Sequence, residues 1–122
     1  MQGKVYPDVA FTVDPARVAA FREAVGQQEG VPPTFATLAE FTALPEVIGD
    51  PELALDFSRI LHGSQSYEYV RPLREGETLT VRSRIESIRE RAGAGFLMLV
   101  TELLDAAGAV VCVARSSMVE RA

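Results

Sequence analysis

The chain has 122 residues, of which 48% are hydrophobic and 24% charged, and its formal net charge is −5. This composition is that of a folded globular protein and argues against an intrinsically disordered one. The acidic balance also argues against nucleic-acid binding, because phosphate contacts need surplus Lys and Arg. The length is that of one domain, so a single domain spanning residues 1–122 is predicted.

The single cysteine, Cys112, lies in the apolar run "GAVVCVARS", where a small buried hydrophobic residue is expected. One cysteine allows neither an intrachain disulfide nor a cysteine-based metal site, and we expect no metal ion and no other cofactor. The lack of a cysteine pair and of a signal-like N-terminus favours a cytoplasmic protein. No window approaches the roughly 20 apolar residues of a membrane span.

The N-terminal part predicts a strand followed by a helix. Residues 5–13, "VYPDVAFTV", have the character of a short strand that Pro7 interrupts. The helix follows because Asp14 is a favourable N-cap, Pro15 suits the first helical position and Gly26 suits the end. The apolar residues that recur at helical spacing between these limits are Val18, Phe21 and Val25.

A second helix is predicted after the loop of residues 27–33, whose two final prolines suit a helix entrance. Its segment, "TFATLAEFTALPEVIG", is apolar around most of its circumference, which predicts a buried helix. Pro45 should end or kink this helix, since proline has no N–H to donate. The residues that produce the apolar pattern are Phe35, Ala36, Leu38, Ala39, Phe41, Ala43 and Leu44.

The remaining segments predict strands. Residues 57–70 are β-like, and in "ETLTVRSRIESI" Leu79, Val81 and Ile85 alternate with polar residues. "FLMLVTELLD" is apolar on both faces in its first half, as in a central strand, and "VVCVARSSMVE" is the last strand. Residues 77–120 therefore predict an antiparallel meander. An apolar helix beside long strands implies an α+β architecture in which a curved sheet wraps the helix.

This order of elements is that of the hot-dog fold, a curved antiparallel sheet around a central buried helix. "PPTF" and the strand "LHGSQSYEYVRPLREGETLTV" resemble the MaoC-like dehydratases, most of all their N-terminal-domain type and the small subunits of (3R)-hydroxyacyl-ACP dehydratases. The resemblance covers about residues 8–120. The features typical of that group are Tyr69 at a strand end, then "RPL" at 71–73, Gly76, and "ETL" at 77–79.

The resemblance implies binding of acyl thioesters of CoA or acyl carrier protein, and hydro-lyase chemistry. Catalytic members carry a Gly-Asp-x-Asn-Pro-x-His motif before the central helix, because hydration needs a base to activate water and an acid to protonate the α-carbon. Where this motif should lie, the sequence reads "AVGQQEGVPPTF", without Asp or His. The resemblance therefore implies an acyl-binding dehydratase or hydratase subunit that lacks the catalytic dyad and needs a catalytic partner.

His62, the only histidine, is predicted near the start of the strand after the central helix. Three interpretations stay open for it: a partly exposed residue with local hydrogen bonds, a residue that lines the acyl groove alone or with Gln65, or a catalytic base. Thr34 and Phe35 are further candidates for substrate binding. Thr34 and Thr37 could offer hydroxyls to a substrate, and Thr34 could instead cap the helix.

Glu40 is the best intrachain partner for His62, since it is the one acid between Phe35 and Leu44. Similar hot-dog thioesterases often place their catalytic carboxylate on this helix. A buried Glu would have a raised pKa and could act as a general base toward water. The alternative function is thus an acyl-CoA thioesterase that uses Glu40 with or without His62. The opposite prediction is that Glu40 points outward at a helix edge or into a subunit interface.

A single hot-dog unit leaves part of its sheet and one side of its helix uncovered. We therefore expect a homodimer, or a heterodimer with a dyad-bearing hot-dog subunit, with acyl grooves between the subunits. The arginines of "RIESIRERAG" and its preceding strand are expected on a solvated strand face, or against the phosphates of CoA or the acidic surface of a carrier protein. These arginines are Arg82, Arg84, Arg89 and Arg91.

Overall fold

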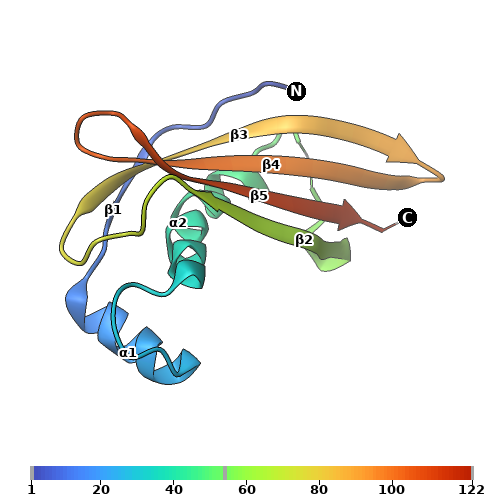
Figure 1. Cartoon of the computed structure of the whole chain (residues 1–122). Coiled ribbons are helices and arrows are strands. Elements are labelled where there is room, and N and C mark those ends of the chain that lie inside the picture. The colour runs from blue at the N-terminus through green and yellow to red at the C-terminus, as the bar shows by residue number, and fades with distance from the viewer. Residues whose placement is uncertain (1, 54, 122) are drawn as a thin grey trace.

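The computed structural model describes residues 2–53 and 55–121. Within these residues, five strands form one antiparallel sheet in the order β1–β3–β4–β5–β2: β1 (Val9–Thr12), β2 (Ile60–Tyr69), β3 (Thr78–Arg91), β4 (Ala94–Leu104) and β5 (Val110–Glu120). The sheet curves around helix α2 (Ala36–Ile48), while helix α1 (Pro15–Val25) lies at one end of the molecule (Figure 1). The predicted α+β architecture, a curved sheet around a central helix, is confirmed. No helix in the described ranges is long and apolar enough to cross a membrane.

Strands β3 to β5 are the predicted meander, since each pairs with the next in antiparallel register. The first strand is shorter than the predicted residues 5–13. Only Val9–Thr12 pairs with β3 as a ladder, and Val5 makes a single bridge to Arg84, with Pro7 between the two.

Helix α1 begins and ends where the sequence predicted. The Asp14 carboxylate accepts a hydrogen bond of 3.1 Å from the Ala16 backbone N–H, which satisfies one of the unpaired donors of the first turn. Gly26 ends the helix in the left-handed conformation, with φ of 77°, which glycine adopts without steric cost. Val18 is buried but Val25 is exposed, so only part of the predicted apolar pattern reaches the core.

Helix α2 buries one face, which consists of small residues and a large aromatic at its entrance. Phe35 is fully buried, stacks on Phe21 with 5.4 Å between ring centroids, and meets Phe11 edge-on. Ala36, Ala39 and Ala43 are also buried. The prediction of a helix buried around most of its circumference is wrong at Phe41, which is 57% exposed. The sheet curves around one side of the helix and leaves the other side open.

Pro45 was predicted to end or kink helix α2. The helix continues to Ile48, so the first of these two alternatives is wrong. The proline deprives the helix of one backbone hydrogen bond, because it has no N–H to donate to the Phe41 carbonyl. The last turn forms nevertheless because Val47 is fully buried in a second apolar cluster. That cluster also contains Tyr6, Ile85, Leu97, Leu99 and Met118.

Strand β4 is the central strand of the sheet, as predicted, but its first half is covered on one face only, because Phe96 on the outer face is 41% exposed. Leu99 and Val100, which point to opposite faces, are both buried. Val100 lies between Arg84 and Arg115 in the ladder, so long arginine side chains flank it on the outer face. Cys112 of β5 is buried too, as predicted, and burial raises the pKa of its thiol to about 11.

Candidate functional site

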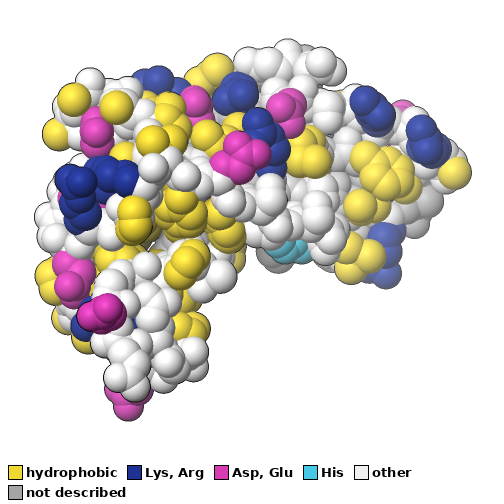
Figure 2. All heavy atoms as spheres, in the orientation of Figure 1, with side chains coloured by type: hydrophobic (Ala, Val, Ile, Leu, Met, Phe, Trp, Pro, Cys, Tyr) yellow, Lys and Arg dark blue, Asp and Glu magenta, His cyan; other side chains and the backbone are white. Residues whose placement is uncertain are grey.

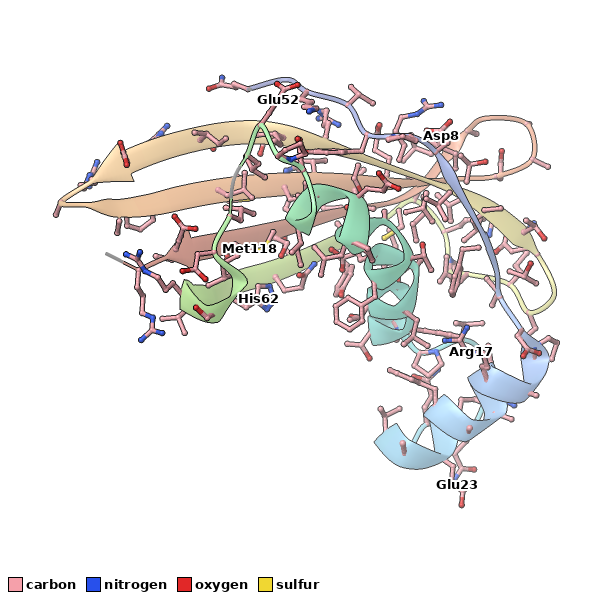
Figure 3. The ribbon with its side chains drawn as sticks, turned by 180° about the vertical axis from the view of Figure 1, so that it is seen from behind. Asp8, Arg17, Glu23, Glu52, His62 and Met118 are labelled. Atoms are coloured by element: carbon pink, nitrogen blue, oxygen red, sulfur yellow. The ribbon has the colours of Figure 1, made fainter. Side chains whose placement is uncertain are left out.

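A cavity of about 370 Å³ opens between helix α2 and strands β2 and β5. Its apolar walls come from Phe41, Leu44, Ile48, Ile60, Leu99 and Met118. Its polar groups are Thr37, Glu40, His62, Gln65, Tyr67 and Ser116. Apolar walls with a few converging polar side chains are the usual form of a small-molecule binding site. Figure 3 shows His62 and Met118 close together on the side of the sheet that faces α2.

A bulge in β2 brings His62 and Gln65 to the same face of the sheet. In a regular strand, residues three apart point to opposite faces. Here the register shifts between His62 and Ser64, so that His62 pairs with Met118 and Gln65 pairs with Ser116. Met118 and Ser116 are two residues apart on β5 and share one face. The extra residue in β2 therefore turns His62 toward the cavity.

Glu40 points from α2 into this cavity and is only 9% exposed, so the prediction of an outward-facing Glu40 is wrong. Its Oε1 accepts hydrogen bonds of 2.9 Å from the Gln65 amide and 2.9 Å from the Tyr67 hydroxyl. The Tyr67 hydroxyl is also hydrogen bonded to Thr37. Burial raises the pKa of Glu40 above its ordinary value, and the hydrogen bonds from Tyr67 and Gln65 offset part of that rise.

Gln65 connects Glu40 to His62. Its Nε2 donates to both carboxylate oxygens of Glu40, and its Oε1 lies 3.1 Å from His62 Nε2. Because Gln65 Oε1 can only accept, His62 Nε2 must carry the hydrogen of this bond. Ser116 Oγ lies 3.0 Å from the same nitrogen. A buried carboxylate is thus connected through the Gln65 amide to an exposed imidazole. A joint catalytic role of Glu40 and His62 stays a prediction.

The structure does not bring the other two predicted binding residues to the cavity. Thr34 is exposed in the 3-10 turn Pro33–Phe35, and its side chain does not cap α2. Phe35 belongs to the core with Phe11 and Phe21. Sequence reasoning missed Tyr67 and Ser116. Tyr67 could have been found, because it lies two residues from Gln65 on the same strand face, whereas Ser116 joins the site only through the pairing of β2 with β5.

Glu40→Gln should change how stability depends on pH. The folded-state pKa of Glu40 lies above its ordinary value of 4.5. In the unfolded chain the carboxyl therefore loses its proton first, and the stability that Glu40 contributes falls as the pH rises from the ordinary to the raised pKa. The variant has no such loss, so its stability relative to the natural protein should increase with pH. Urea unfolding of both proteins between about pH 4 and pH 8 measures this difference.

Glu23→Gln, on the exposed surface of α1, controls for the loss of one negative charge. If the stability difference between the Glu40→Gln protein and the natural protein stays constant over the whole pH range, burial does not raise the pKa of Glu40.

Comparison with known proteins identifies the family. The family described as "FAS1-like, dehydratase domain region" matches residues 6–114. A UPF0336 protein from Streptomyces coelicolor is 38% identical to this chain, and the alignment covers 98% of this chain and 92% of that protein. The match extends over nearly the whole chain, so it includes helix α2 and the strands that form the cavity.

Solved structures share the fold at low sequence identity. One similar structure is a chain of the C-terminally truncated HadBC (3R-hydroxyacyl-ACP dehydratase) complex from Mycobacterium tuberculosis, with a TM-score of 0.84 and 20% identity. The alignment covers 97% of this chain and 96% of that chain. Another is the MaoC-like dehydratase from Rhodospirillum rubrum, with a TM-score of 0.71 and 16% identity. That alignment covers 100% of this chain and 94% of the dehydratase chain. The chain therefore belongs to the FAS1-like dehydratase-region family and has the hot-dog fold of the MaoC-like dehydratases.

Proposed function

We propose that this protein is an acyl-binding, non-catalytic subunit of a (3R)-hydroxyacyl dehydratase or enoyl hydratase. It holds the acyl chain of a CoA or acyl carrier protein thioester, and a second hot-dog protein supplies the Asp and the His. One observation carries the proposal: a cavity with apolar walls lies in a chain whose loop before α2 lacks both catalytic residues. Its likeness to a chain of a two-protein dehydratase complex supports the need for a partner.

The cavity walls suit an acyl chain for a simple energetic reason. Each methylene group moved from water into apolar surroundings contributes about 0.8 kcal/mol. The side chains of Phe41, Leu44 and Ile48 from α2 face Ile60, Leu99 and Met118 from the sheet across this space. The residues of the loop 26–33 do not line the cavity. In this proposal the chain therefore contributes binding energy and position, and the partner contributes the proton transfers.

The partner is expected at the free edge of β2. This strand has ten residues and forms one edge of the sheet in the part of the chain that the structure describes. An edge strand of this length can pair with a strand of another chain. Phe41, exposed on the open side of α2, lines the cavity that lies between α2 and β2. A subunit placed along β2 would cover Phe41 and close the cavity from that side.

Reconstitution tests the proposal. The purified protein should not hydrate a trans-2-enoyl thioester, because it lacks the acid and the base of that reaction. A dyad-bearing hot-dog protein from the same organism should show little activity alone, and the mixture should be active. Hydration is measured by the loss of the enoyl thioester absorbance. A partner with its catalytic Asp replaced by Asn is the matched control and should give no activity in the mixture. Turnover by the isolated protein would refute the proposal.

Glu40 favours a second candidate function, thioester hydrolysis. The Glu40 carboxylate would take a proton from water while the water oxygen attacks the thioester carbonyl carbon. The C–S bond then breaks, and the leaving thiolate takes up that proton. The observation behind this candidate is the burial of Glu40 in the cavity, next to Gln65 and near His62. Thiol release from a panel of acyl-CoAs tests it, and equal release by the natural protein and by Glu40→Gln would exclude it.

A further inference from the structure

The cavity beside α2 has a polar end and an apolar end. At the polar end, hydrogen bonds join side chains from the first half of α2 to β2. At the apolar end, side chains from the second half of α2 and from the start of β2 pack against one apolar cluster. A thioester group would lie at the polar end, with its acyl chain directed to the apolar end. The polar end contains Thr37, Glu40 and Tyr67, and the apolar end contains Leu44, Ile48 and Ile60.

A second cavity, of about 240 Å³, begins at the apolar end of the first. Ile60 and Met118 line both cavities. In the ladders, Met118 lies between His62 of β2 and Leu97 of β4, so these three side chains are on one face of the sheet. This is the face that α2 covers, because His62 and Met118 line the first cavity. The two cavities therefore lie on the same face and share two wall residues.

Apolar side chains form the walls of the second cavity next to this junction. Leu97 is buried, and Ile88, which pairs with it in the ladder of β3 and β4, is 39% exposed. Leu53 and Leu55, from the connection between α2 and β2, line the cavity from the other side and pack against the same apolar cluster as Leu97. An apolar path thus continues from the first cavity into the second.

This apolar path ends at a charged rim. Arg89, Glu90 and Glu120 line the second cavity at the end of the molecule that the hairpin of β3 and β4 forms. Figure 2 shows basic side chains beside hydrophobic ones at this end, which is opposite to α1 in Figure 1. Charged groups are costly to remove from water, so an acyl chain would not extend in apolar surroundings beyond this rim.

The dimensions of the two cavities predict which acyl chains reach the second one. From Glu40 to Ile48 the helix advances about 12 Å, and an extended alkyl chain advances about 1.25 Å per carbon, so the first cavity covers roughly ten carbons. From Met118 to Glu120 strand β5 advances about 7 Å, so the second cavity covers about five carbons more.

We propose that the second cavity continues the acyl site and makes this protein selective for long acyl chains, those of about twelve carbons or more. This inference rests on the proposed function. Each methylene group that passes the junction at Met118 leaves water for apolar walls, whereas a chain that ends in the first cavity gains nothing there. Ile88 lines the second cavity and not the first, so it affects the binding of long chains alone.

A short and a long thioester test the inference. Decanoyl-CoA and hexadecanoyl-CoA, each below its micelle concentration, are titrated into the natural protein and two variants. The natural protein should bind the long thioester at least about tenfold more tightly. Ile88→Trp fills the second cavity and should remove most of this preference without changing the Kd of decanoyl-CoA. Val70→Trp is the matched control, because Val70 is 74% exposed and lines neither cavity, and both Kd values should stay the same.

Ile88→Asp is a second variant, which places a charge at the second cavity without adding volume. It should also reduce the preference, because its charge acts on the CoA group of both thioesters alike but lies beside the long chain alone. Circular dichroism and thermal unfolding show whether each variant is folded. A natural protein that binds the two thioesters equally would overturn the inference, and so would a preference that persists in the folded Ile88 variants.

The same titrations separate this inference from the proposed function. If both thioesters bind with equal affinity, the acyl-binding function stands and the second cavity has no part in it. If neither thioester binds, to the protein alone or to its mixture with the dyad-bearing partner, the proposed function fails and the selectivity for long chains fails with it. Preference for the long thioester that Ile88→Trp removes and Val70→Trp retains supports both.

Discussion

Phe35→Ala should lower the free energy of unfolding by about 3–5 kcal/mol, the usual cost of truncating a fully buried phenylalanine. Phe35 is fully buried at the entrance of α2, between Phe11 and Phe21. The change removes the contacts of the ring with both neighbours and leaves a cavity that the rigid sheet cannot fill. Since small domains are stable by only about 5–15 kcal/mol, the variant should be marginally folded. Urea unfolding followed by circular dichroism measures the change.

Phe41→Ala is the matched control, because it removes the same ring from the same region of the chain. Phe41 is 57% exposed, so its loss should cost less than about 1 kcal/mol. Two phenylalanines that belong to one apolar repeat in the sequence should therefore differ several-fold in their effect on stability. Equal losses for the two variants would contradict the one-sided burial of α2.

Phe41→Asp should separate this protein from its partner while leaving it folded. Exposed aromatic residues at the centre of an interface typically contribute about 2–4 kcal/mol to binding, which is roughly 30- to 1,000-fold in Kd. Phe41 is exposed at the cavity on the open side of α2, where the proposed partner would cover it. An aspartate there would carry a charge into the contact without an ion partner. Sedimentation or calorimetry with the dyad-bearing protein measures the loss.

Val25→Asp is the control for a charge placed on another exposed apolar residue. Val25 is 51% exposed at the end of α1, far from β2 in the chain fold (Figure 1). The Val25→Asp variant should associate with the partner as strongly as the natural protein does. Undiminished association of the Phe41→Asp protein would show that the partner does not cover the open side of α2, and the interface would then have to lie elsewhere.

The ends of α1 and the strand character of β3 could be predicted because their signals are local. Asp14 and Gly26 act on the few backbone groups next to them, and the alternation of Leu79, Val81 and Ile85 is a property of one extended segment. The prediction failed where a distant contact decides the outcome. Pro45 should stop a helix, yet the helix continues because Val47 packs against residues of β3, β4 and β5.

The site was predicted in part. Glu40, His62 and Gln65 lie together in the cavity, and they could be chosen because a lone acid in an apolar helix and a lone histidine on a strand are visible in the sequence. Their role in binding or catalysis stays a prediction. Their contact could not be derived, because His62 and Gln65 are three residues apart and would face opposite ways in a regular strand. Thr34 and Phe35 were chosen because they lie at the start of the central helix. In the structure, Phe35 packs in the core and Thr34 lies in the 3-10 turn, so neither lines the cavity.

The sequence by itself determined the order of the elements along the chain, the spacing of apolar residues in each one, and the absence of Asp and His from the loop directly before the central helix. These properties follow from neighbouring residues, which set backbone conformation and amphipathic faces over a few positions. The tertiary structure alone decided which side of α2 is open, that a bulge turns His62 toward Glu40, and that a second cavity joins the first at Met118. Each of these depends on strand register and sheet curvature, which arise from pairing between segments far apart in the chain.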